Sequence, residues 1–137
     1  PAQQLDCRLL ESIPQGGLFF VDSTHTLGPA GECTRIILEM LPRVREVAFA
    51  HFHDIWFPYD YDSNVLRTLF FWHESPLLHA FLVGNDSWRV LASLSMLHHG
   101  RPETLHAMFP TYRPRTHVNG IAIDEGHYPT SIYLTRD

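Results

Sequence analysis

The sequence of 137 residues predicts an α/β fold in which a mostly parallel sheet carries flanking helices. Two observations lead to this prediction: continuous apolar runs typical of buried strands, and apolar residues at helical spacing between them. A strand, a helix and a second strand form a βαβ unit with parallel strands and a right-handed crossover. With 45% hydrophobic residues the chain can bury one core, so we expect a single domain over residues 1–137.

Each element of the first half has its own signal. Apolar residues at helical spacing predict a short helix over Leu5–Ile13. They also predict a helix that begins near Gly31–Glu32 and stops at Pro42. The two apolar runs predict strands, Leu18–Val21 and Val47–His53, the first of them buried on both faces.

The second half continues the alternation of helices and strands. A long amphipathic helix is expected over Asn64–Val83, with a kink where Pro76 interrupts it. The other expected elements are a strand over Trp88–Leu94, a short helix over Pro102–Met108, a loop over Pro110–Pro129 and a strand over Ser131–Thr135.

Composition and charge narrow the function classes. A net charge of −5 and the lack of a dense basic cluster argue against nucleic-acid binding. No apolar run reaches the roughly 18 residues of a membrane span, and the first residues lack a signal-peptide pattern. The spacing of Cys7 and Cys33 suggests neither a disulfide framework nor a cysteine zinc site, which fits a reducing compartment. We therefore expect a cytoplasmic protein with neither nucleic-acid nor membrane partners.

Polar residues follow both strands of the βαβ unit, in the segments Asp22–His25 and His51–Asp54. In open α/β sheets, ligands bind outside the carboxyl ends of the strands. We therefore expect Asp22, His53 and Asp54 to converge there, as a cradle for a divalent metal. The carboxylates favour magnesium, whereas the imidazole favours zinc, iron, nickel or manganese.

Structural roles explain several of these residues as well. Asp22 is equally well explained as a cap for the following loop. His51 fits a hydrogen-bonded core histidine better than a ligand, because it lies deeper in the strand. The aromatic segment Trp56–Tyr61 is either a lid over a substrate or a loop anchored in the core.

Four motifs follow one another along the chain: Phe20–His25, Leu41–Arg43, His51–Ile55, and Phe71–Glu74 with Leu77–Leu78. In this order they resemble the patterns FxDSSH, LPRL, HxHDIF and FWNEQYLL of a bacterial family of class I S-adenosylmethionine-dependent methyltransferases. The resemblance covers about residues 5 to 95, and the last strand is also similar. His73 stands where the family usually has Asn, and Ser75 where it has Gln.

This resemblance implies a Rossmann-like methyltransferase half-fold, with the C-terminal strand antiparallel. The strands ending at Asp22 and at His53–Asp54 would be the fourth and fifth strands of that fold. The implied activity is O-methylation of a small molecule or a glycan. The resemblance assigns cofactor binding to Asp22 and Ser23, a metal to Asp22, His53 and Asp54, and catalysis to His25, His53 and Asp54. Without a metal, His25 or His53 would serve as the base.

The chain has no counterpart of the family's glycine-rich cofactor loop, which should precede Leu5. We therefore expect weak binding of S-adenosylmethionine by this chain alone. Without its usual neighbour, the strand Leu18–Val21 would pair with a second copy in a homodimer, unless the helix Leu5–Ile13 covers its edge. Two other functions stay open: a noncatalytic remnant or interaction module, and a metal-dependent hydrolase that uses the histidine-rich strand ends.

Overall fold

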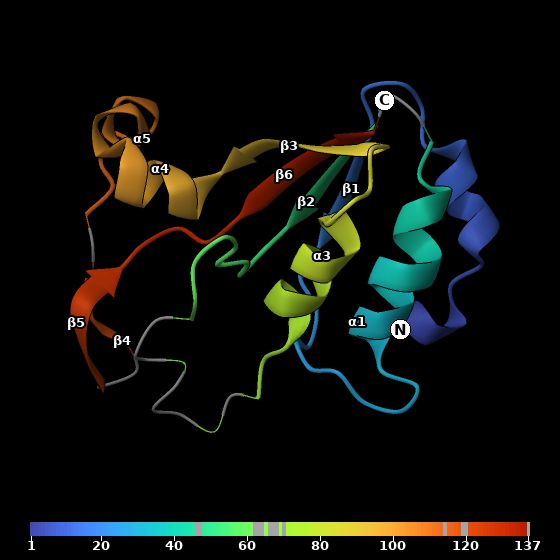
Figure 1. Cartoon of the computed structure of the whole chain (residues 1–137), viewed down its shortest axis with the longest axis horizontal. Helices are drawn as coiled ribbons and strands as arrows, with labels where there is room; N and C mark the ends of the chain where they lie inside the picture. Colours follow the sequence, from blue (N-terminus) through green and yellow to red (C-terminus); the bar gives the residue numbers. More distant parts are fainter. Residues whose placement is uncertain are drawn as a thin grey trace.

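The computed structural model describes residues 1–45, 48–61, 65, 69, 71–113, 115–118 and 121–136. Its main sheet is mixed and has four strands in the order β1-β2-β6-β3 (Figure 1). The strands are β1 (Leu18–Val21), β2 (Phe49–Phe52), β3 (Trp88–Ser93) and β6 (Ile132–Arg136). The pair β1 and β2 is parallel, whereas β6 is antiparallel to both β2 and β3. The chain is therefore α/β, as predicted.

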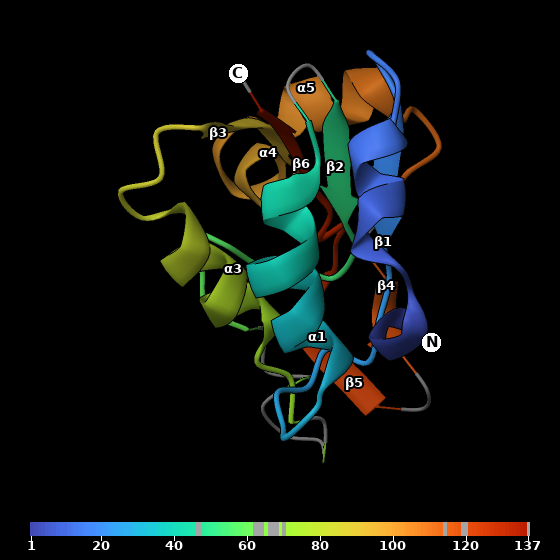
Figure 2. The same cartoon turned by 90° about the vertical axis from the view of Figure 1, so that its right-hand side faces the viewer.

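One helical segment connects β1 to β2. It starts as α1 (Glu32–Arg35), continues through a π-helical turn, η3 (Ile36–Met40), and ends as a 3-10 turn, η4 (Leu41–Arg43). The expected start near Gly31–Glu32 is confirmed, and the segment ends one residue beyond Pro42. Figure 2 shows α1 on the same side of the sheet as α3 (Glu74–Leu82).

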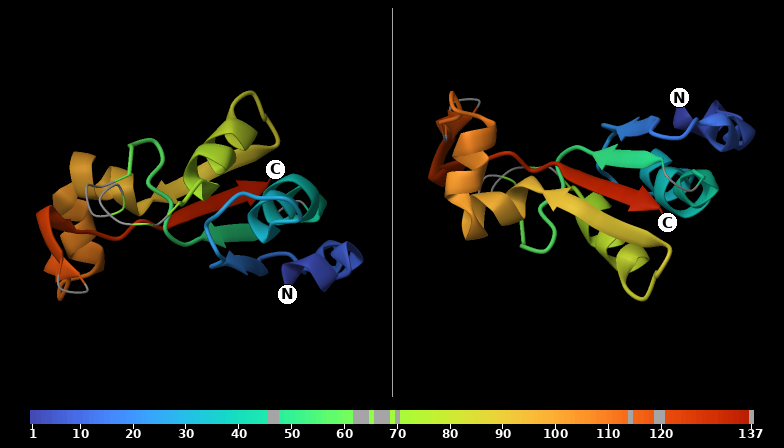
Figure 3. Two further views of the ribbon diagram at one scale, coloured as in Figure 1. Left: turned by 90° about the horizontal axis from the view of Figure 1, so that it is seen from below. Right: turned by 90° about the horizontal axis from the view of Figure 1, so that it is seen from above.

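The remaining helices lie at the two ends of the molecule. Two short 3-10 helices, η1 (Ala2–Gln4) and η2 (Cys7–Ser12), form the N-terminal end, and η2 lies within the helix expected over Leu5–Ile13. At the other end, α4 (Leu94–Gly100) and α5 (Pro102–Met108) gather with the C-terminal hairpin (Figure 3, orange and red). The prediction of a helix over Pro102–Met108 is confirmed. Within the residues described, no helix has the length and apolarity to cross a membrane.

The helices α1 and α3 pack against one face of the sheet. Alternate strand residues such as Val21, Phe52 and Leu134 pack with the helices into the main core. On the opposite face, Leu18 and Phe20 are 54% and 55% exposed. The expectation that the first strand is buried on both faces is therefore wrong, because α1 and α3 cover the same side.

The helix expected over Asn64–Val83 is shorter than predicted. Its first part falls largely outside the described residues, and residues 71–73 are not helical. α3 begins at Glu74, so Pro76 lies in the first helical turn instead of at a kink. Backbone N–H groups of a first turn have no partner within the helix, so a proline there removes no hydrogen bond.

The loop expected over Pro110–Pro129 is also wrong. This segment contains an antiparallel pair of strands, β4 (Arg115–Val118) and β5 (Ile121–His127). The prolines and glycines of the region suggested a loop. Yet Asn-Gly, which stands between the two strands in the sequence, is a strong signal for a hairpin.

The open edge of β1 leads to a test of self-association. Among the described strands β1 pairs with β2 alone, and its exposed Phe20 adds apolar surface beside the free edge. We expect the mass measured by light scattering to rise with concentration from 15.8 kDa toward a dimer. Phe20→Lys should weaken the dimer about tenfold or more, because it removes an aromatic ring that the dimer interface would bury.

Val83→Lys is the matched control, since Val83 is an exposed apolar residue at the end of α3. It should leave the dimer unchanged. A mass that stays at 15.8 kDa over the whole concentration series would contradict pairing through β1.

Candidate functional site

His25 lies in the loop that follows β1 and is only 7% exposed. Its backbone has a left-handed conformation, with φ of 57°, which is uncommon for a residue other than glycine. The backbone N–H groups of His73 and Glu74 donate to its carbonyl oxygen at 2.7 and 3.2 Å. These bonds attach the loop to the start of α3 and hold the strained conformation.

The side chain of His25 forms a buried pair with Glu74. Its Nδ1 lies 2.7 Å from Oε2 of Glu74, which is 1% exposed. The other carboxylate oxygen accepts a hydrogen bond from Ser23 Oγ at 3.4 Å. Because a carboxylate only accepts hydrogen bonds, Nδ1 of His25 carries a proton and neutral Nε2 keeps its lone pair.

Two further carboxylates lie on the Nε2 side of the ring. Asp22 Oδ1 is 3.6 Å and Asp54 Oδ2 is 3.7 Å from Nε2. Both distances are too long for a direct hydrogen bond. Since neither carboxylate can donate a hydrogen bond, the lone pair of neutral Nε2 stays free to accept a proton. The arrangement is that of a general base oriented by one carboxylate, with two others to stabilise its protonated form.

The sheet brings the two aspartates together. The N–H of His53 donates to the carbonyl of Val21 at 2.9 Å, which extends the β1–β2 pairing to the strand ends. Asp54 also has a left-handed backbone, with φ of 54°. Its Oδ1 accepts from Thr130 Oγ1 at 2.9 Å, so this carboxylate links the end of β2 to the start of β6.

Burial and the neighbouring carboxylates act in opposite directions on the pKa of His25. Burial lowers the pKa of the ring, but the hydrogen bond to Glu74 and the charges of Glu74, Asp54 and Asp22 raise the pKa above its ordinary value of 6.5. Because the folded-state pKa is raised, this group stabilises the fold below pH 6.5, and the contribution is lost as the pH rises through the folded-state pKa.

The predicted site residues therefore come together only in part. Asp22, His25 and Asp54 share one location, whereas the half-exposed His53 reaches it through a 3.2 Å contact between its Nδ1 and Asp54 Oδ1. Ser23 binds within the protein, to Glu74 and, at 3.2 Å, to the thiol of Cys33. In the part of the chain that is described, no group of three or more potential ligands has the geometry of a metal site.

His51 lies outside this constellation, on the uncovered face of the sheet. It stacks on Tyr133 with ring centroids 4.3 Å apart and meets the edge of Phe20 at 5.0 Å. Burial and the charge of His53 lower its pKa. Its Nε2 is buried without a hydrogen-bond partner among the described residues, so this nitrogen does not make the hydrogen bond expected of a core histidine.

Two functional residues were missed from the sequence, Glu74 and Thr130. Glu74 belongs to the motif Phe71–Glu74, yet nothing in its local pattern pairs it with His25. A lone glutamate at the start of a helix reads as a favourable charge near the helix N-terminus. The sequence did contain one signal for Glu74, because a charged residue ends an aromatic motif directly before an apolar helix.

The pair of His25 and Glu74 yields a test by NMR titration of the histidine ring. In Glu74→Gln the hydrogen bond to a charged acceptor is lost while burial still lowers the pKa, so the pKa of His25 should fall. Glu103→Gln on the surface of α5 is the matched control, since Glu103 is not among the groups that act on His25. An unchanged pKa in folded Glu74→Gln, with folding checked by circular dichroism, would contradict this pairing.

Comparisons with known proteins do not assign the chain to a family. No protein-family model matches the sequence, and no curated protein or solved structure is significantly similar to it.

Proposed function

We propose that this chain forms the acceptor side of an S-adenosylmethionine-dependent O-methyltransferase, with His25 as the general base. The observation that carries the proposal is the buried pair of His25 and Glu74, which leaves Nε2 free beside Asp22 and Asp54. The acceptor would be a hydroxylated small molecule or a glycan. A base of this kind typically accelerates proton transfer by about 10²–10⁴-fold.

The role of His25 in the reaction follows from which of its two ring nitrogens carries a proton. Nε2 of His25 accepts the proton of the acceptor hydroxyl, while Nδ1 keeps its own proton in the bond to Glu74. The carboxylates of Asp22 and Asp54 stabilise the positive charge that then develops on the ring. S-adenosylmethionine, when bound, supplies a methyl group activated by its sulfonium.

The order and the directions of the strands in the sheet support the proposal. β1 and β2 are parallel neighbours, as the fourth and fifth strands of a methyltransferase would be, and the last strand, β6, is antiparallel. The polar residues follow the carboxyl ends of β1 and β2, where open α/β sheets bind ligands.

For the cofactor, Asp22 and Ser23 are the proposed contacts. Both line a cavity of about 250 Å³ beside α1, and the carboxylate of Asp22 suits a cationic group. Ligand pockets for whole small molecules span roughly 300–1,000 Å³, so this cavity would hold only part of the cofactor. A cavity that holds only part of the cofactor agrees with weak binding of S-adenosylmethionine by this chain.

A divalent metal is the alternative to a histidine base, with Asp22, His53 and Asp54 as its proposed ligands. The donor set does not fit a cation in this arrangement, because no group of three or more potential ligands among the described residues has the geometry of a metal site. The proton transfer above therefore involves no metal.

Replacement of the base gives the main test of the proposed activity. The full-length protein is incubated with radiolabelled S-adenosylmethionine and a panel of catechols and sugars. We expect His25→Asn to reduce methyl transfer by about 10²–10⁴-fold, because the base is lost while asparagine tolerates the left-handed backbone. His53→Asn, at the half-exposed neighbour, is the matched control and should retain most of the activity.

The other outcomes of this assay separate the alternatives. Full activity in folded His25→Asn would overturn the assignment of the base. Activity that a chelator abolishes and added metal restores would favour the metal site. A native protein that transfers no methyl group to any acceptor would favour the noncatalytic module.

Calorimetry tests cofactor binding by residues 1–137 alone. We expect a dissociation constant weaker than micromolar, because the sequence has no glycine-rich loop to hold the cofactor. A micromolar constant, equivalent to about 8 kcal/mol, would show that the described residues suffice.

A further inference from the structure

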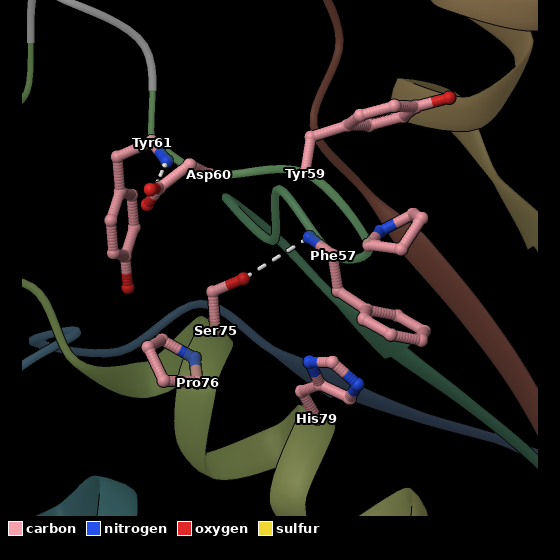
Figure 4. A pocket seen from close by; sticks show the side chains of 8 residues that line it. Phe57, Tyr59, Asp60, Tyr61, Ser75, Pro76 and His79 are labelled. Carbon is pink, nitrogen blue, oxygen red and sulfur yellow. Dashed lines mark hydrogen bonds between the residues drawn. The ribbon is translucent and has the colours of Figure 1, made fainter.

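A second cavity, of about 370 Å³, lies between the segment that follows β2 and the start of α3 (Figure 4). Aromatic side chains form much of its lining, together with a carboxylate and a buried hydroxyl. They are Phe57, Tyr59, Asp60, Tyr61, Ser75 and His79. None of these residues takes part in the His25 site, so the cavity needs its own explanation.

The aromatic rings of the cavity are held in place by neighbouring rings. The centroid of Phe57 is 4.3 Å from that of His79, and the centroid of Tyr59 is 4.4 Å from that of His99. Tyr61 packs against Trp56 at 5.2 Å. The cavity therefore offers fixed, flat apolar surfaces, which limits the entropy that ordering side chains around a ligand would cost.

Ser75 provides a hydrogen-bond donor within the cavity. It is 5% exposed, and its Oγ accepts the backbone N–H groups of Trp56 and Phe57, both at 3.1 Å. These bonds occupy the lone pairs of the oxygen. Its own O–H proton has no acceptor in the described part of the chain. A ligand oxygen would satisfy this donor.

Tyr61 provides a second donor. Its hydroxyl oxygen is buried, and the backbone N–H of Ser75 faces it and lowers the pKa of the hydroxyl, while no described residue accepts the O–H proton. Burial raises the pKa of Tyr61 to about 12, so the hydroxyl keeps its proton at neutral pH. The protons of the Ser75 and Tyr61 hydroxyls are thus both free to bind a ligand oxygen, which favours a ligand rich in oxygen.

The charge of the cavity narrows the class of ligand. Among the described residues of the lining, Asp60 is the one acidic residue and there is no arginine. One Asp60 oxygen already accepts the N–H of Tyr61 at 3.0 Å. A phosphate or carboxylate ligand would be repelled. An organic cation would suit the rings and the carboxylate, but it would leave the hydroxyls of Ser75 and Tyr61 without acceptors.

We propose that this cavity binds a neutral sugar ring. The rings of Phe57 and Tyr59 would pack against the polarised C–H groups of the sugar, because the faces of aromatic rings are electron-rich. Ser75 and Tyr61 donate to sugar oxygens, and Asp60 accepts from a sugar hydroxyl. The inference concerns binding alone and does not depend on methyl transfer.

NMR titration of the full-length protein with methyl pyranosides of glucose, galactose and mannose tests the proposal, without S-adenosylmethionine. At least one sugar should shift the backbone signals of Tyr59, Asp60 and Ser75. Tyr61→Phe should weaken binding about tenfold, because it removes only the hydroxyl. Tyr59→Ala should weaken it at least as much, since it removes an exposed ring that supports no core.

Tyr133→Phe is the matched control, because Tyr133 stacks on His51 on the uncovered face of the sheet. It should leave sugar binding unchanged, and thermal unfolding confirms that each variant is folded. No shift in the cavity with any pyranoside, or undiminished binding by Tyr61→Phe, would overturn the proposal. Binding of tetramethylammonium in place of the sugars would do the same and would assign the cavity to a cation.

Discussion

The hydrogen bond between His25 and Glu74 is the interaction on which the rest of the site depends. A carboxylate as deeply buried as that of Glu74 is costly unless a partner compensates it. The partner comes from a loop 49 residues away in the chain, so the pair attaches the end of β1 to the start of α3. Ser23 and the backbone of His73 strengthen the same attachment. The positions of both aspartates relative to the imidazole follow from this connection.

Adjacent residues at the start of α3 belong to two different sites, the His25 site and the aromatic cavity. Glu74 is one of the three carboxylates around the imidazole of His25, whereas Ser75 lines the aromatic cavity. Successive helical residues point in directions about 100° apart, so one helical turn can contribute to both. Movement of α3 would therefore affect both sites together. The aromatic rings of Trp56 and Trp72 lie between the His25 site and the cavity. The ring centroid of Trp72 is 4.6 Å from that of His25.

The sequence predicted features that depend on local pattern and missed those that depend on distant partners. Apolar runs located β1 and β2, and the polar residues after them included Asp22, His25 and Asp54. Thr130 is 76 residues from Asp54, and no periodicity links the two. Nor does an apolar run reveal how many of its faces are covered. For that reason Phe20 was expected in a core although one layer of helices leaves it in solvent.

The left-handed backbone at His25 and Asp54 restricts which amino acids these two positions can hold. Asparagine, aspartate, histidine and glycine adopt this conformation at modest cost, whereas valine, isoleucine and threonine do so with strain, and proline cannot. Chemistry narrows the choice further, because glycine has no side chain to carry a proton or a charge. The tolerated sequences at these positions are thus few even before any ligand is considered. In a library of variants, depletion at both positions would reflect backbone geometry as well as loss of activity.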